Sequence, residues 1–188
     1  MNKIFFFLLT LLTLSPIFGQ ENLQSIEKPS SDDEVYVYIS RVNTGAFLIN
    51  FRVFDGDKFL GTISSGEYYI YKTTPGKHIF WAASENRDFL DANLQGGKTY
   101  FIQVDALMGA FVAQVDIRPL DPNYKKDKKQ VWRIIKNGTK IDSLSDYNKD
   151  KTENISKGME KYNELKKKDS NKIESLPFTY FFDNANKP

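Results

Sequence analysis

The stretch that decides the fold is Phe47–Ile63, with the sequence FLINFRVFDGDKFLGTI. In its first half apolar residues alternate with Asn50 and Arg52, and side chains on a strand alternate between its two faces. The apolar face is Phe47, Ile49, Phe51 and Val53. The tetrapeptide 55–58, Asp-Gly-Asp-Lys, is a hairpin signal because Gly permits the positive φ of a tight turn. Phe59–Ile63 is then the return strand of an antiparallel hairpin.

Similar short runs, separated by Gly and Pro turns, occupy the chain from Glu34 to Leu120. The other expected strands are Val35–Ser40, Glu67–Lys72, His78–Ala83, Asp88–Leu94, Thr99–Asp105 and Phe111–Arg118. No connecting segment is long enough for a crossover helix, which disfavours a parallel sheet. The pattern predicts about eight strands in a sandwich or barrel of antiparallel hairpins, of which we favour the antiparallel β-sandwich. We expect Phe51, Trp81 and Val115 to share its interior.

Composition narrows the range of functions. The chain has 188 residues, 40% of them hydrophobic, which suits one domain with appendages. Its net charge of +2 is too small for the whole chain to suggest nucleic-acid binding. It contains no cysteine, so disulfides, thiolate metal ligands, thiol nucleophiles and a cysteine-linked lipid are all excluded.

The N-terminus has the layout of a secretory signal peptide. A basic start at Lys3 precedes a mainly apolar run from Ile4 to Leu14, and Gly19 offers a small residue for cleavage. The apolar run is shorter than the ~20 residues that a transmembrane helix needs, so a membrane anchor is the weaker interpretation. We expect residues 1–19 to be removed on export, and the polar stretch 20–33 to be a flexible leader.

Beyond Leu120 the sequence predicts a helical, Lys-rich extension over 121–188. Asp121-Pro122 is a candidate helix start, with an end near Asn137-Gly138, and a second amphipathic helix is expected over Asn154–Lys168. Gly158 weakens that second helix. From residue 121 to 172 there are 15 Lys and Arg against 9 Asp and Glu. The aromatic segment Leu176–Phe182 is costly to leave in water, so we expect it to dock on an edge strand or on the helices.

Five short motifs occur in the order typical of one family of bacterial envelope domains. They are Val35-Tyr36-Val37-Tyr38, Asp55-Gly56-Asp57-Lys58 leading to Gly61, Gly66-Glu67-Tyr68, Pro75-Gly76-Lys77-His78 and Gly97-Lys98-Thr99-Tyr100-Phe101. On these motifs the segment Glu34–Leu120 resembles a domain of unknown function whose members are commonly lipoproteins. The resemblance implies a small sandwich like the PEGA-type modules, and it implies no catalytic residues.

The chain departs from its lipoprotein relatives after the signal peptide, where they carry a lipidated Cys and this chain has Ile17-Phe18-Gly19-Gln20. Without a Cys no diacyl anchor forms. We therefore expect the mature protein in the periplasm or outside the cell, or held there by partners.

Residues with catalytic potential are few. His78 is the only histidine and follows a Pro-Gly-Lys turn, which favours a structural role over that of a base or metal ligand. The candidate carboxylate pairs for a hydrolase are Asp88 with Asp91, and Asp105 with Asp116. Asp55 and Asp57 suit a hydrogen-bonded turn better than a calcium loop. We expect no metal, no cofactor and no catalytic residues.

Two sets of side chains are candidates for binding. The candidate binding surface is Tyr36, Tyr38, Tyr68, Tyr69 and Tyr71, which alternatively pack within or cap the sandwich. The candidate basic contact is Lys125, Lys126, Lys128, Lys129, Lys166, Lys167 and Lys168, for which a solvated helix face is the alternative.

These observations favour an exported, non-enzymatic envelope module that binds an unknown protein or glycan through the sandwich surface. The first alternative is a structural subunit of an envelope complex that pairs its aromatic C-terminus with a neighbour's sheet edge. A hydrolase with acidic loop residues is the second alternative. Nucleic acid is not an expected partner, since the sequence contains no nucleic-acid-recognition motif.

Overall fold

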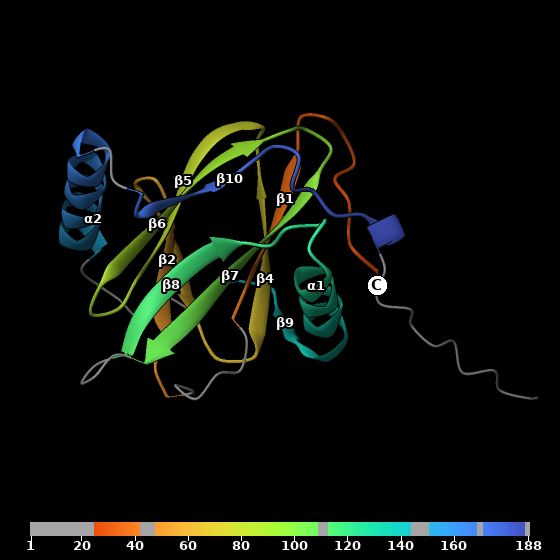
Figure 1. Ribbon diagram of the computed structural model, residues 1–188, viewed down its shortest axis with the longest axis horizontal. Coiled ribbons are helices and arrows are strands. Elements are labelled where there is room, and N and C mark those ends of the chain that lie inside the picture. The colour runs from red at the N-terminus through yellow and green to blue at the C-terminus, as the bar shows by residue number, and fades with distance from the viewer. Residues whose placement is uncertain (1–24, 42–47, 109–112, 144–150, 169–170, 187–188) are drawn as a thin grey trace, which may run out of the picture.

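Two five-stranded sheets face each other in the computed structural model, which describes residues 25–41, 48–108, 113–143, 151–168 and 171–186 (Figure 1). Sheet A has the strand order β8-β7-β1-β4-β9 and sheet B has the order β10-β6-β5-β2-β3. The strands are β1 (Val35–Ser40), β2 (Phe51–Asp55), β3 (Lys58–Ile63), β4 (Glu67–Thr73), β5 (Gly76–Ala83), β6 (Arg87–Leu94), β7 (Thr99–Met108), β8 (Ala113–Pro119), β9 (Thr139–Ile141) and β10 (Ile173–Leu176).

The mainly β class is confirmed, but the expected strand number is wrong. The described residues form ten strands instead of about eight. The two additional strands, β9 and β10, come from the extension after Leu120, and each adds an edge to one sheet. They are only three and four residues long, too short for an alternating pattern to reveal them.

The expected antiparallel pairing holds for five strand pairs of the described residues and fails for three. The predicted hairpin pairs β2 with β3, and Gly56 at its turn has φ +56°. However, β1 pairs with β7, β4 with β9 and β6 with β10 in parallel. Between β1 and β7 the chain passes through strands of sheet B, so the parallel pair needs no crossover helix.

The interior between the sheets is built from alternate residues of both. Phe51 and Val115 are part of it, as are Leu90 and Ile102. Trp81 is not, so the expectation that it shares this interior is wrong. It lies on the opposite face of β5, in a separate cluster beside α2 (Lys151–Lys167). Both faces of β5 are apolar, and the alternation therefore did not say which one faces inward.

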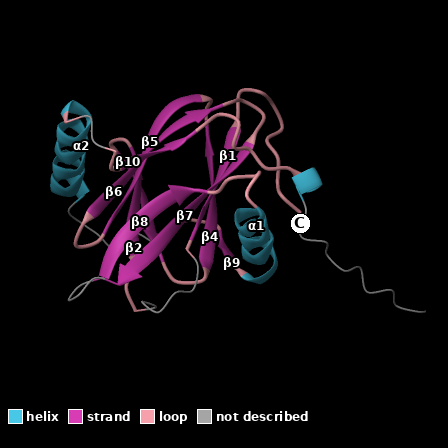
Figure 2. Ribbon diagram, in the orientation of Figure 1, coloured by secondary structure: helices cyan, strands magenta, loops and turns pink. Residues whose placement is uncertain are grey.

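The two helices cover the outer faces of the two sheets (Figure 2). The first, α1 (Lys125–Asn137), places Val131, Ile134 and Ile135 on the tyrosine-rich outer face of sheet A. The second, α2, places Ile155, Met159 and Tyr162 against the outer face of sheet B.

The expected start of the first helix at Asp121-Pro122 is wrong. The helix begins at Lys125 after Tyr124, whose side chain makes no capping bond. Instead, the Asp121 carboxylate accepts the backbone N–H of Asn123 within a turn that precedes the helix.

The leader, expected to be flexible, packs on the sandwich from residue 25. Ile26 is 2% exposed, and its N–H donates to Asn184 Oδ1 at 3.0 Å. The next N–H, of Glu27, donates to Tyr38 Oη at 2.9 Å. In Figure 1 this segment therefore lies beside the short C-terminal helix η1 (Asn184–Asn186). The predicted signal peptide, residues 1–19, lies outside the described residues.

The aromatic C-terminal segment docks on an edge strand, which confirms that expectation. β10 pairs with β6, and Phe182, 2% exposed, bridges to Thr99. The Tyr100 hydroxyl donates to the Phe178 carbonyl at 2.8 Å. Among the described helices, none has the length and apolarity needed to span a membrane.

Candidate functional site

The expectation that the tyrosines form an exposed binding surface is wrong, because the tyrosines pack inside the molecule. Tyr36, Tyr38 and Tyr68 lie beneath α1, and Tyr71 lies in the interior between the sheets. Tyr69, on the inner face, is partly buried. The alternative interpretation, that these rings pack and cap the sandwich, is the one that the structure supports. Since α1 covers the outer face of sheet A, both faces of β4 are buried.

His78 lies in a polar network that joins the two sheets. Its Nδ1 is 2.8 Å from Asp55 Oδ2, and its Nε2 is 2.9 Å from the Thr74 carbonyl oxygen. The Tyr71 hydroxyl, from sheet A, donates to the same Asp55 oxygen, and Lys58 Nζ donates to Tyr71 Oη. The sequence did not indicate Asp55 as a partner. The hydrogen bond to Asp55 raises the pKa of His78 despite its burial.

This arrangement suits a structural histidine. A carbonyl oxygen can only accept, so the Nε2 that faces Thr74 carries a proton and donates it. A general base needs a free nitrogen lone pair directed at a substrate. Both ring nitrogens of His78 are already engaged within the protein.

Of the two carboxylate pairs proposed for hydrolysis, the structure separates the first and places the second side by side. Asp88 and Asp91 are three residues apart on β6 and so project from opposite faces. Asp88 accepts the Ile117 N–H at 2.8 Å, and burial raises its pKa to about 6. Asp105 and Asp116 are opposite each other on β7 and β8, where the Gln103 amide donates to Asp105. The described residues contain no group of three or more His, Asp or Glu placed to hold a metal ion.

The two lysine clusters lie on different helices and on different faces of the molecule. Lys125, Lys126, Lys128 and Lys129 are in the first two turns of α1, over sheet A. Lys166 and Lys167 end α2, over sheet B, and Lys168 follows it. They do not form one basic contact, and each has to be judged by its own surroundings.

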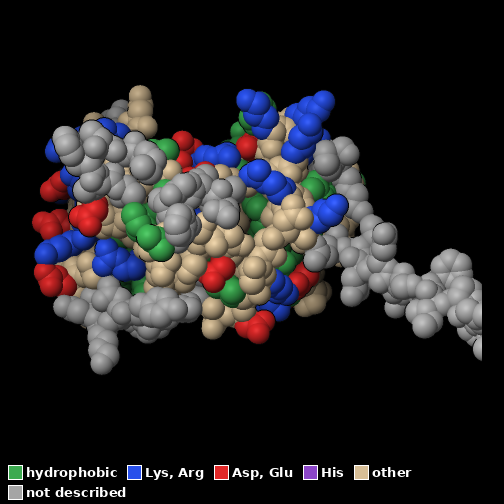
Figure 3. Space-filling model, turned by 90° about the horizontal axis from the view of Figure 1, so that it is seen from below, with side chains coloured by type: hydrophobic (Ala, Val, Ile, Leu, Met, Phe, Trp, Pro, Cys, Tyr) green, Lys and Arg blue, Asp and Glu red, His purple; other side chains and the backbone are tan. Residues whose placement is uncertain are grey.

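The exposed side of α1 is rich in cations, five of them exposed and Lys128 half-buried. We call it the α1 basic face, and it consists of Lys125, Lys126, Lys128, Lys129, Arg133 and Lys136. Within the described residues, no ion pair joins any of these six to a carboxylate. Figure 3 shows Lys and Arg side chains gathered where α1 lies, whereas acidic and basic side chains are mixed at the end where α2 lies.

The only acid in α1 points inward. Asp127 is 6% exposed, and it follows the same helix side as Val131 and Ile134, four and seven residues later. Its carboxylate accepts from Arg118 Nη1 at 3.2 Å and from the Asp121 N–H at 3.0 Å. The sequence alone did not reveal this role of Asp127, although its spacing to two apolar residues of the same helix was a signal for it.

On α2, by contrast, lysines are paired with acids. Lys157 pairs with Glu153, and Lys161 Nζ is 3.3 Å from Glu164. Lys166 Nζ reaches Asp91 of β6 at 2.5 Å, so it joins the helix to the sheet beneath it. The α2 lysines are therefore largely neutralised where they stand.

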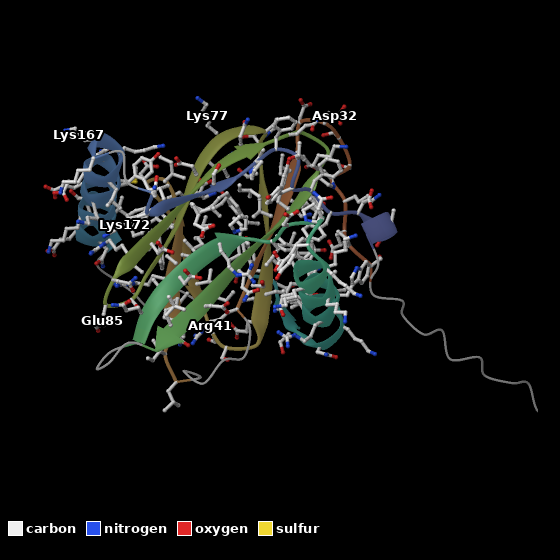
Figure 4. The ribbon with its side chains drawn as sticks, viewed as in Figure 1. Asp32, Arg41, Lys77, Glu85, Lys167 and Lys172 are labelled. Atoms are coloured by element: carbon white, nitrogen blue, oxygen red, sulfur yellow. The ribbon has the colours of Figure 1, made fainter. Side chains whose placement is uncertain are left out.

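Hollows lie beside both helices. One, of about 190 Å³, lies where the C-terminal end of α1 meets Arg41 and Glu67. Arg41, 1% exposed, lies over the Phe51 ring at 4.2 Å and donates to the carbonyl of Ile49, so its charge serves the packing of the sandwich end. Figure 4 labels Arg41 between the lower ends of the sheets.

The second hollow, of about 420 Å³, lies between the C-terminal half of α2 and sheet B, and we call it the α2 groove. Its side chains come from β5, β6, β10 and α2. They include Lys77, Ile79, Asp91, Asn93, Tyr162, Lys166 and Ser175. The Tyr162 hydroxyl donates to Asp91 Oδ1 at 2.7 Å, and burial together with this bond raises the pKa of Tyr162.

Comparison of the chain with protein-family models, with curated proteins and with solved structures found no match. The resemblance to PEGA-like envelope domains therefore stays a prediction from the motifs.

Proposed function

We propose that the protein is an exported, non-enzymatic module of the cell envelope that binds an acidic glycan through the α1 basic face. The observation that carries the proposal is the distribution of charge on α1. Six cations line its exposed side, while its single acid is buried against Arg118. Unpaired like charges repel one another at close range, and an anionic ligand relieves that repulsion.

The form of the surface favours a linear polyanion. The cations extend along a helix of 13 residues, which is about 20 Å long at 1.5 Å per residue. The apolar residues of α1 face the sheet, so the helix has no free apolar side to insert into a bilayer. A protein interface usually needs buried aromatic anchors, whereas an acidic polymer needs only a row of cations.

The alternative of a complex assembled through the C-terminus has less support from the structure. β10 is already hydrogen-bonded to β6 of its own chain, and Phe182 is buried there. A neighbour that took up this strand would have to displace it from its own sheet first.

The test compares two quadruple variants that remove the same charge. In one, Lys125, Lys126, Lys128 and Lys129 become Gln, and in the other Lys157, Lys161, Lys167 and Lys168 become Gln. We expect the wild-type protein to be retained on immobilised polygalacturonate and to elute with salt. The α1 variant should elute at less than about half the wild-type salt concentration, and the α2 variant near the wild-type position.

Both variants are at exposed or half-exposed positions, so thermal unfolding should change by no more than about 2 °C. Equal loss of retention in the two variants would show that only net charge matters and would refute a site on α1. Absence of retention by the wild-type protein would refute the proposal that the protein binds an acidic glycan.

A further inference from the structure

We propose that the α2 groove is a second binding site, for a sugar-sized molecule that carries one negative charge. Its volume of about 420 Å³ lies within the usual range for small-ligand sites, about 300–1,000 Å³. The site is on the opposite sheet from α1 and uses none of the α1 cations. The inference therefore stands apart from the proposed acidic-glycan surface.

The charge of the groove selects the charge of the ligand. Both oxygens of Asp91 are engaged, one by the Tyr162 hydroxyl at 2.7 Å and the other by Lys166 Nζ at 2.5 Å. Lys77 is exposed and has no carboxylate within 4 Å among the described residues. The ring of His78 is held by Asp55 and Thr74. One cation is therefore in excess, which matches a monoanion.

The neutral groups of the groove select the rest of the ligand. The side chains of Asn93 and Ser175 are exposed and make no hydrogen bond to another described residue, so an amide and a hydroxyl are available. Ile79 and the Tyr162 ring add apolar surface beside them. A pyranose ring has hydroxyls around its edge and C–H groups on its faces, and it fits this combination.

The elements that form the groove hold these groups in place. Lys77, Ile79, Asn93 and Ser175 come from strands paired in one sheet, where Lys77 is opposite Asn93 and Ser175 is opposite Asp91. Tyr162 packs on Phe89 with ring centroids 5.7 Å apart, which fixes the helical wall. Figure 4 shows Lys77 projecting from β5 and Lys167 at the end of α2. The chemistry on these elements points to a sugar acid.

The experiment titrates the protein with D-glucuronate, D-glucose and acetate, and follows the backbone amide signals of Lys77, Asn93 and Ser175 by NMR. We expect glucuronate to shift these signals with a dissociation constant about tenfold lower than that of glucose or of acetate. Equal affinity for acetate and glucuronate, or no shift at these amides, would refute the site.

Substitutions in the groove distinguish the contribution of the ligand's negative charge from that of its sugar ring. Lys77→Met should weaken glucuronate about fivefold and leave glucose unchanged, and Asn93→Ala with Ser175→Ala should weaken both sugars. Lys161→Met is the matched control, since Lys161 is exposed on the same helix as Tyr162 but does not line the groove. An effect of Lys161→Met equal to that of Lys77→Met would refute the assignment, and so would no effect of Lys77→Met.

Discussion

The two helices cover opposite faces of the same sandwich, but they are fastened differently. α1 is held by an apolar stripe and by the inward ion pair of Asp127 with Arg118, which leaves its cations unpaired outside. α2 lies close against aromatic rings, and its charged groups pair with acids of the helix and of β6. The cations of α1 are therefore available to a ligand, whereas most cations of α2 are already paired with acids of the protein.

The largest effect is expected at Gly158, where α2 comes closest to the sheet. A Cβ at this position would lie 2.4 Å from Cη2 of Trp81, well below any normal contact. Gly158→Val should force the helix away from the ring and lower the free energy of unfolding by about 3 kcal/mol. Urea denaturation followed by tryptophan fluorescence measures it.

Ser156→Val is the matched control for that variant. It places the same β-branched residue at an exposed position of the same helix, so it introduces the branched side chain without the clash. If both variants lose the same stability, then close packing on Trp81 is not what Gly158 provides.

A smaller effect is expected when the inward acid of α1 is removed. Asp127→Ala takes away the acceptor of Arg118 and of the Asp121 N–H, and it should lower the free energy of unfolding by about 2 kcal/mol. Urea denaturation measures it, with Asp142→Ala as the control because Asp142 is exposed. A result equal to that of Asp142→Ala would mean that α1 is held by its apolar stripe alone.

The smallest effect concerns the polar network between the sheets, which depends on neither helix. The bond to Asp55 raises the folded-state pKa of His78 above its ordinary value of 6.5. The stabilisation is therefore complete below pH 6.5 and is lost as pH rises through the folded-state pKa. We expect a decline on the order of 1 kcal/mol above pH 6.5.

Denaturation at a series of pH values, for the wild-type protein and for His78→Gln, measures this pH-dependent part of the free energy of unfolding. Asp88, whose pKa is raised to about 6, titrates in both proteins, so the difference between the two curves isolates His78. A wild-type curve parallel to that of the variant above pH 6.5 would show that His78 does not supply it.

The strands were predictable wherever one face is polar. Phe51 and Val53 alternate with Arg52, and both lie in the interior as expected. On β5 the rule failed, because Phe80 is as apolar as Trp81 and the alternation has no preferred face. Whether a helix covers the outer face decides between them, and no local pattern carries that information.

The candidate sites show the same limit. The lysines of α1 were visible in the sequence, and their exposure follows from the helical period. The tyrosines were also visible, but the burial of Tyr36, Tyr38 and Tyr68 depends on α1, which is more than 50 residues further along the chain. The α2 groove joins β5, β6, β10 and α2, whose residues come together only in the fold. Gly158 looked like a weakness of its helix, and it is the position at which that helix meets Trp81.

The pairing of β10 with β6 has a consequence for the timing of folding. Residues 173–176 complete sheet B, and Asn184 accepts a bond from Ile26 across 158 positions. Contacts between distant parts of a chain form slowly, because the intervening loop must first be closed at an entropic cost. A polypeptide emerging from the ribosome thus lacks this edge strand of sheet B until residues 173–176 have been synthesised, and until then β6 presents an unpaired edge.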